Sequence, residues 1–260
     1  MTLLSGSPGP YLIAHRGAMA EAPENTAAAF ERALAFPIDG IEFDVQLTRD
    51  GVPVVFHDGD LNRITGEKGA VSDYSLAELK TFDYGRWFSE AFVGTTIPTL
   101  EEVLEHYAHR TALLIELKIG DDTGRSDEKR AELVQQVIAL ISQWVPAERR
   151  GGIYILSFDS EALDLVHRAA PDLKCIRNLE QPVSISPDGS VSGYLHGFGI
   201  ALDRITEPFV RAVHGVGKKV MTYSCNTRTR IDQGWDAGID YLLTDHPAAV
   251  AAHFRHVKPK

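Results

Sequence analysis

Hydrophobic and polar residues follow two alternating patterns along this chain. Short apolar runs rich in β-branched residues are separated by longer segments in which apolar residues recur with helical spacing. Such alternation is typical of repeated βα units, which build parallel sheets. The runs that we predict to be parallel strands are Tyr11–His15, Gly40–Leu47, Ala112–Leu117, Gly152–Phe158, Leu173–Leu179, Gly197–Leu202, Val220–Cys225 and Tyr241–Thr244.

Helical segments occupy the intervals between these runs. In the first of them, over residues 26–35, Asn25 or Thr26 is a suitable N-cap, and Pro37 ends the helix. Eight parallel strands with crossover helices close naturally into a (β/α)8 TIM barrel, whereas a doubly wound sheet usually has fewer strands. The length of 260 residues fits one such barrel, so we predict a single domain over residues 1–260. The other predicted helices are Leu100–Ala108, Glu128–Trp144, Ser160–Ala169, Glu207–Val216 and Arg228–Ala237.

The run Val52–His57 does not fit this alternation. It follows the second predicted strand after so short a link that it must fold back as an antiparallel hairpin, and Asp50-Gly51 is a favoured two-residue turn. This turn predicts that Asp44 faces His57 across the hairpin. Because residues two apart on a strand share a face, Glu42, Asp44 and His57 are expected to converge on one surface.

Residues 59–97 interrupt the alternation a second time. Turn-forming residues, a short predicted helix over Ser75–Thr81 and aromatic residues such as Trp87 and Phe88 fill this stretch. It is too long for an ordinary loop between a strand and a helix. We therefore predict a small insertion over residues 59–97 that caps the mouth of the barrel.

The charge of the chain narrows the choice of partners. A formal net charge of −10 argues against nucleic acid as a partner, because phosphate backbones are bound by basic surfaces.

No apolar run approaches the roughly 20 residues of a membrane-spanning helix, and Met1–Pro10 lacks the basic and apolar regions of a signal peptide. The expected location is cytoplasmic, with no stable membrane anchor. Cys175 and Cys225 lie in apolar runs and are expected to be buried.

Candidate catalytic residues lie where the first three predicted barrel strands end. His15 ends the first, Glu42 and Asp44 lie on the second, and Glu116 lies near the end of the third. Active sites of such barrels lie at the end of the barrel that the carboxyl ends of the strands form. Three carboxylates suit one divalent cation, Mg²⁺ or Ca²⁺. His15 and His57 are suited to general acid and base catalysis near neutral pH.

Two basic residues adjoin these positions. Arg16 and Lys118 could contact phosphate oxygens, Arg16 through its planar fork and Lys118 as a point charge. Each motif alone also has a structural explanation: His15-Arg16-Gly17 as a turn, Glu42-Phe43-Asp44 as a solvated strand face, and Glu116 with Lys118 as an ion pair. The convergence of all of them on one barrel mouth favours a site for phosphoryl transfer.

Longer motifs run along nearly the whole chain. They are His15-Arg16-Gly17, Pro23-Glu24-Asn25-Thr26, Glu42-Phe43-Asp44-Val45, Asp50-Gly51, His57-Asp58, Ile97-Pro98-Thr99-Leu100, Glu116-Leu117-Lys118, Ser157-Phe158, Asn226-Thr227 and Thr244-Asp245-His246-Pro247. Together with the segment that follows His57-Asp58, these motifs resemble the glycerophosphodiester phosphodiesterase family.

The resemblance implies a phospholipase-C-like barrel that cleaves a small-molecule glycerophosphodiester, a deacylated phospholipid, to glycerol 3-phosphate and an alcohol. Whether the glycerol 2-hydroxyl first attacks phosphorus to give a cyclic phosphate, or water attacks directly, stays open. By position, the resemblance implies an acid–base pair of His15 and His57, phosphate contacts from Arg16 and Lys118, and metal ligands at Glu42, Asp44 and Glu116.

One position departs from the family pattern. Tyr223-Ser224-Cys225-Asn226 stands where members usually carry Trp-Thr-Val-Asn. Tyr223 keeps an aromatic ring at the mouth, where it is expected either to stack on the substrate or to pack at the rim.

Two other functions fit parts of the sequence. A lysophospholipase D acting on substrates that keep an acyl chain would need an apolar groove, which the aromatic residues of segment 59–97 could form. A catalytically silent metabolite-binding barrel is disfavoured, because a binding protein does not need both His15 and His57. The choice of metal, the alcohol released and the oligomeric state are not determined by the sequence.

Overall fold

The computed structural model describes residues 9–119, 127–185 and 193–257. Residues 1–8, in which the sequence predicts no signal peptide, lie outside this range. Within the described residues, eight parallel strands each pair with the next, and β1 pairs with both β2 and β9, so the sheet closes into a barrel. The predicted TIM barrel is confirmed. Its strands are β1 (Tyr11–His15), β2 (Gly40–Leu47), β4 (Ala112–Leu117), β5 (Ile153–Ser157), β6 (Lys174–Leu179), β7 (Gly197–Ala201), β8 (Lys219–Tyr223) and β9 (Tyr241–Thr244).

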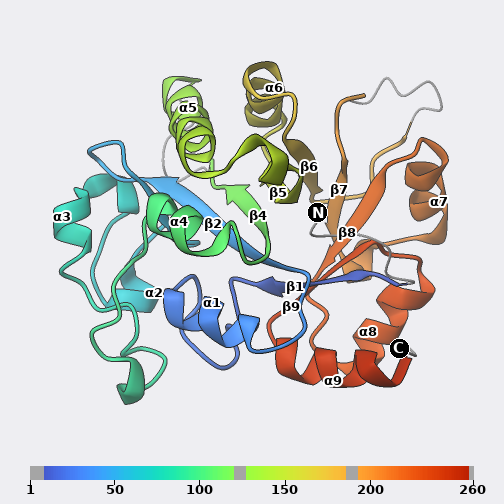
Figure 1. Ribbon diagram of the computed structural model, residues 1–260, viewed down its shortest axis with the longest axis horizontal. Helices are drawn as coiled ribbons and strands as arrows, with labels where there is room; N and C mark the ends of the chain where they lie inside the picture. Colours follow the sequence, from blue (N-terminus) through green and yellow to red (C-terminus); the bar gives the residue numbers. More distant parts are fainter. Residues whose placement is uncertain (1–8, 120–126, 186–192, 258–260) are drawn as a thin grey trace.

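Helices surround the barrel, with α5 and α6 on one side and α8 and α9 on the other (Figure 1). Thr26 caps the first helix, because its hydroxyl accepts the backbone N–H of Ala29 and leaves Asn25 free for another contact. The last helix was not predicted from the sequence. The helices are α1 (Ala27–Leu34), α4 (Leu100–Tyr107), α5 (Asp127–Trp144), α6 (Ser160–Ala169), α7 (Glu207–Gly215), α8 (Arg228–Asp236) and α9 (Pro247–Val257), with short 3-10 turns at Ala147–Gly152 and Leu202–Arg204.

Alternate residues of each strand face the inside of the barrel and the surrounding helices. Outward residues such as Phe43 and Ile115 join the core beneath the helices, in which Cys175 is also buried. The inward residues close the interior with a second apolar layer, which contains Ile13, Leu114, Tyr154, Leu156, Ile176, Met221, Tyr241 and Leu243. The strands therefore present their inward polar residues above this layer, at the carboxyl ends.

The hairpin after β2 forms, but its predicted register is wrong. β3 (Pro53–Val55) pairs antiparallel with β2 so that Val55 lies opposite Val45, and the backbone N–H of Phe56 donates to the backbone oxygen of Asp44 at 3.0 Å. Phe56, not His57, is therefore the residue opposite Asp44. The cause is a three-residue turn that ends in Gly51, whose φ of +78° is the left-handed conformation that this loop length requires.

The segment 59–97 has its own apolar cluster, which is built on β3. Its elements are α2 (Asn62–Thr65), a 3-10 turn at Val71–Asp73, α3 (Leu76–Leu79) and a second 3-10 turn at Glu90–Phe92. Val54 and Phe56 pack against Leu61, Ile64, Val71, Leu79, Tyr84 and Ile97. Trp87 stays 37% exposed. Figure 1 places α2 and α3 on the opposite side of the molecule from α7 and α8.

Within the described residues, no helix combines the length and the apolar character that crossing a membrane requires.

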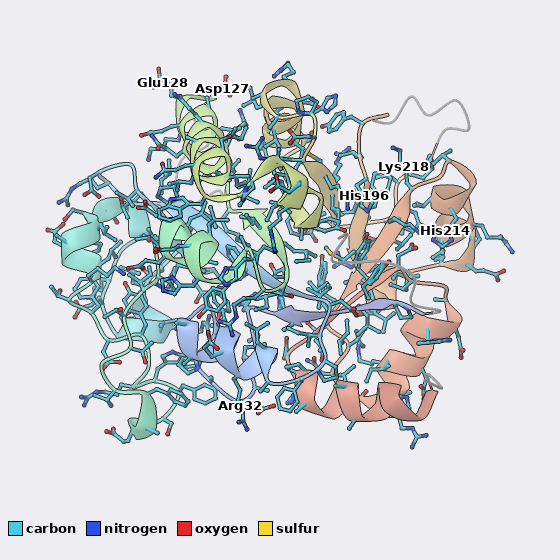
Figure 2. All side chains as sticks on the ribbon, in the orientation of Figure 1. Arg32, Asp127, Glu128, His196, His214 and Lys218 are labelled. Carbon is cyan, nitrogen blue, oxygen red and sulfur yellow. The ribbon has the colours of Figure 1, made fainter. Side chains whose placement is uncertain are left out.

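A partly buried histidine, His196, directly precedes β7. The ring of His196 lies 2.7 Å from the hydroxyl of Tyr241. Burial, with the charges of Lys174, Lys219 and Lys218 adding to it and Asp240 opposing, lowers its pKa from 6.5 to about 4. Figure 2 shows His196 on the same side of the molecule as Lys218.

Because folding lowers this pKa, the unfolded chain binds the proton more readily. The free energy of unfolding is therefore expected to fall as the pH drops from about 6.5 to about 4, by up to about 3 kcal/mol from this group. His196→Gln should remove that part of the pH dependence, measured by urea unfolding across this range. His106→Gln, at an exposed position on α4, is the control. Parallel curves for wild type and H196Q would contradict the prediction.

Candidate active site

Three carboxylates meet inside the carboxyl end of the barrel. Glu42 and Asp44 lie two apart on β2, and Asp44 is the register partner of Glu116 on β4. All three side chains face inward, and their oxygen atoms lie within 4.8 Å of one another. Glu42 and Asp44 are almost fully buried. The alternation of inward and outward side chains on β2 and β4 thus brings together the three carboxylates that the sequence predicts to be metal ligands.

The cluster holds more negative charge than its surroundings compensate. Burial, with the charges of Asp44 and Glu116 adding to it, raises the pKa of Glu42 well above its usual value. Burial and Asp44 likewise raise the pKa of Glu116. At Asp44 burial opposes ionisation, but Arg16 and Lys118 outweigh it and lower the pKa. Three clustered oxygen donors with excess charge fit a hard divalent cation.

His15 points into this cluster from the end of β1. Its Nδ1 lies 2.6 Å from Asp245 Oδ1, and its Nε2 lies 3.9 Å from Glu42 Oε2. Asn226 fixes Asp245 in turn, because its Nδ2 donates to Asp245 Oδ2 at 2.5 Å and its Oδ1 accepts the Asp245 backbone N–H at 2.8 Å. A carboxylate on Nδ1 directs Nε2 toward the carboxylates.

His57 reaches the site in spite of the shifted register. β3 ends at Val55, and the side-chain amide of Gln46 donates to the backbone oxygens of Phe56 at 3.0 Å and Asp58 at 2.9 Å, which holds the following residues against β2. The charge of His57 stabilises the ionised forms of both Asp44 and Glu116. Its Nδ1 lies 2.8 Å from Asp58 Oδ1, so both candidate histidines have a carboxylate on Nδ1.

The two predicted phosphate ligands lie on either side of the carboxylates. Arg16 adopts a left-handed backbone (φ +52°) that lets its N–H donate to Glu42 Oε2 at 3.2 Å, while its Nε lies 3.4 Å from Asp44 Oδ2. Lys118 Nζ lies 3.0 Å from Glu116 Oε1 and 3.7 Å from Asp44 Oδ1. A phosphate bound over the cluster would meet both cations.

Tyr223, the last residue of β8, completes the set of predicted site residues. Burial, with Glu116 and Glu180 adding to it, raises its pKa to about 12. Its ring packs against the apolar layer inside the barrel. The phenol is therefore neutral at physiological pH and close enough to Glu116 to feel its charge.

Further polar residues contact the site. Asn25, one of the two candidate N-caps, instead donates its side-chain amide to Asp44 Oδ2 at 2.9 Å. Asn178 on β6 donates to Glu116 Oε2 at 3.1 Å, in space that Gly199 leaves free, since a Cβ there would lie 2.2 Å from Asn178 Oδ1. Asp245 and Asn226 belong to the motifs Thr244-Asp245-His246-Pro247 and Asn226-Thr227, and this membership was the only feature of the sequence that could have assigned them to the site. Nothing in the sequence pointed to Asn178.

Comparisons with known proteins agree over most of the chain. Residues 15–249 match the model of the glycerophosphoryl diester phosphodiesterase family. A glycerophosphodiester phosphodiesterase of Caldanaerobacter subterraneus subsp. tengcongensis is 36% identical over 241 residues, covering 91% of this chain and 94% of that protein. One from Bacillus altitudinis is 34% identical over 244 residues, covering 91% and 94%.

A solved structure extends the likeness to three dimensions. The phosphodiesterase of Oleispira antarctica, in complex with the product sn-glycerol-3-phosphate, superposes with a TM-score of 0.85. The two chains are 28% identical, and the match covers 95% of this chain and 97% of that one.

Replacing Glu42 by glutamine tests the carboxylate cluster independently of turnover. The amide keeps an acceptor for the Arg16 N–H but removes one buried charge, so in chelator E42Q should melt no lower than wild type. Excess Mg²⁺ or Ca²⁺ should stabilise wild type, by about 2.7 kcal/mol at about 100 times the Kd, and E42Q should lose most of this gain. Scanning calorimetry measures both.

Glu105→Gln, at an exposed position on α4, is the matched control and should respond to metal as wild type does. Equal stabilisation of wild type and E42Q by metal would show that the cluster does not hold the ion.

Proposed function

Because this chain belongs to the glycerophosphoryl diester phosphodiesterase family, we propose that it hydrolyses glycerophosphodiesters to glycerol 3-phosphate and an alcohol, and so acts in lipid and glycerol metabolism. The observation that carries the proposal is the buried cluster of Glu42, Asp44 and Glu116 with two carboxylate-backed histidines beside it. The names of the relatives and the product bound to the Oleispira antarctica structure support it.

The cluster would hold one divalent cation. Glu42, Asp44 and Glu116 offer only oxygen donors, which suit Mg²⁺ and Ca²⁺ alike. When bound, such an ion neutralises charge on the phosphate and orients the substrate oxygens. The raised pKa of Glu42, caused by burial and by Asp44 and Glu116, supports this assignment, since a cation relieves the same repulsion.

Arg16 and Lys118 would bind the phosphate. Both cations already touch the carboxylate cluster, so a phosphate oxygen placed over the cluster lies within reach of each. Arg16 offers a planar pair of donors and Lys118 a compact charge, and both oppose the charge that develops on the phosphoryl oxygens. Tyr223 would contact the glycerol or the alcohol with its ring.

His15 and His57 would move the protons. Asp245 and Asp58 each accept a hydrogen bond from Nδ1–H, which leaves Nε2 of each ring to take or give a proton. We assign His15 as the base that deprotonates the attacking oxygen, either the glycerol 2-hydroxyl or a water. His57 is the acid that protonates the departing alcohol. The domain organisation that we propose is a single barrel with residues 59–97 inserted.

A lysophospholipase D activity is the second candidate. Exposed Phe158, which directly follows β5 at the carboxyl end, and exposed Trp87 in segment 59–97 favour it, because they offer apolar area to an acyl chain.

One assay separates these activities. Purified protein is expected to release glycerol 3-phosphate from glycerophosphocholine or another head-group ester in the presence of Mg²⁺ or Ca²⁺, and to lose turnover in chelator. Faster release from a lysophospholipid than from its deacylated counterpart would favour the second candidate. Binding of these esters without turnover would favour a metabolite-binding barrel and contradict the proposal.

Exchange of the leaving group tests the division of roles between the histidines. His57→Ala is expected to lower kcat on alkyl-alcohol esters by about 10²–10⁴-fold and to leave metal-induced stabilisation intact. With p-nitrophenol as leaving group, which needs no proton, H57A should recover much of the lost rate. His15→Ala should not recover, because the attacking oxygen still requires a base. Steady-state kinetics on both esters measures this.

His106→Ala, at an exposed position on α4, is the control and should turn over both esters at the wild-type rate. Losses of the same size for H57A and H15A on both esters would refute the assignment.

A further inference from the structure

Arg63, on α2 of segment 59–97, holds two carboxylates of the site at once. Its Nη1 and Nη2 donate to Glu24 at 2.9 and 2.8 Å, and its Nε and Nη2 donate to Asp58 at 2.6 and 3.1 Å. Glu24 and Asp58 lie 34 positions apart in the chain, and Glu24 precedes β2 whereas Asp58 follows it in the sequence. A single guanidinium on α2 therefore connects this helix both to the loop after β1 and to the residues that follow β3.

Both carboxylates also contact the proposed machinery. Glu24 Oε1 accepts a second bond from Arg16 Nη1 at 2.7 Å, and Asp58 Oδ1 accepts from His57 Nδ1 at 2.8 Å. The oxygen atoms that Arg63 Nη2 contacts are these same two. Arg63 is thus one hydrogen-bonded residue away from both the proposed acid and a proposed phosphate ligand.

The environment makes this contact stronger than an ordinary surface ion pair. The side chain of Arg63 is 45% exposed, but that of Glu24 is only 5% exposed, and a buried carboxylate that loses a partner carries a large penalty. Glu24, His57 and Asp58 are close enough together to hold a metal ion. The Arg63 guanidinium already supplies a cation to two of them, so this group needs no second ion.

Trp87 holds the guanidinium from its other side. The Arg63 Cζ lies 5.4 Å from the centre of the Trp87 ring, and Trp87 Nε1 donates to the backbone oxygen of Tyr84 at 3.0 Å. Tyr84 belongs to the apolar cluster of segment 59–97. The packing of this segment therefore reaches Arg63 directly.

We propose that Arg63 is a positioning residue, through which segment 59–97 orients His57 by way of Asp58 and Arg16 by way of Glu24. This inference rests on the proposed function. It assigns to the segment a part in the reaction: the carboxylate of Asp58 keeps its orientation toward Nδ1 of His57 only while Arg63 holds both of its oxygens. A lysine at this position could not replace the arginine, because a point charge does not reach two carboxylates with the geometry of a planar fork.

The first test compares Arg63→Gln and Arg63→Lys with Arg86→Gln. Arg86 is an arginine of the same segment that pairs only loosely, at 3.8 Å, with Asp83, and its side chain is 64% exposed. R63Q is expected to lower kcat on alkyl-alcohol esters by about 10–100-fold, with R63K recovering little of it and R86Q matching wild type. The loss should shrink with p-nitrophenol as leaving group, because a misplaced acid does not matter there.

Single substitutions at the two carboxylates test separately the contact that leads to His57 and the contact that leads to Arg16. Asp58→Asn should reproduce the loss in kcat, and Glu24→Gln should chiefly raise KM through Arg16. The double variant R63Q/D58N should have the kcat of D58N alone, since both changes break the same contact.

Three outcomes would overturn the inference. They are a kcat and KM of R63Q within about twofold of wild type, a loss of equal size with both leaving groups, and additive effects in R63Q/D58N. Should R63Q fail to fold, R63K and D58N decide by the same leaving-group comparison. If the wild type cleaves no ester, the proposed function is wrong, and the inference about Arg63 is tested separately. The contact is then judged from the imidazole ¹⁵N spectrum of His57. A hydrogen-bonded Nδ1 proton should be present in wild type and R86Q and lost in R63Q, and an unchanged signal in R63Q would overturn the inference.

Discussion

The site is organised around the mutual repulsion of three carboxylates, of which Glu42 and Asp44 are buried and Glu116 is partly buried. Adjacent parallel strands in register place Asp44 beside Glu116, and the alternation along β2 adds Glu42 on the same face. Burial and like charge together favour the protonated forms, so such a cluster persists only where cations oppose it. Arg16 and Lys118 supply part of this opposition. Burial and its two carboxylate neighbours still raise the pKa of Glu42, and in the proposed function a divalent cation supplies the remaining positive charge.

Further polar residues hold the groups around these carboxylates in place. Each candidate histidine has a carboxylate on Nδ1, and each of those carboxylates is held by a further residue: Asp245 by Asn226, and Asp58 by Arg63. These contacts draw on residues that follow the last two barrel strands and on residues of segment 59–97. In the proposed function, a residue of this kind would orient a catalytic group without touching the substrate.

Much of the fold followed from patterns that are local. The strands β1, β2, β4 and β9 begin and end at the predicted residues, because each apolar run is bounded by residues that favour turns or helix caps. The hairpin shows where local reasoning stops. Asp50-Gly51 predicted a two-residue turn, but the left-handed Gly51 closes a three-residue one and shifts the register by one residue. His57 approaches Asp44 because Gln46 holds the chain beyond β3, not because the two residues are paired.

The sequence by itself determined the barrel, the family resemblance and the carboxylates, histidines and cations that gather at its mouth, because strand alternation and strand order are written in residues near one another in the chain. Only the tertiary structure decided which side chains hold these groups in place. Asn178 reaches Glu116 through space left by Gly199, and Arg63 joins Glu24 to Asp58. Hydrogen bonds between residues far apart in sequence need donor–acceptor distances accurate to a few tenths of an ångström, and only the packed barrel sets those distances.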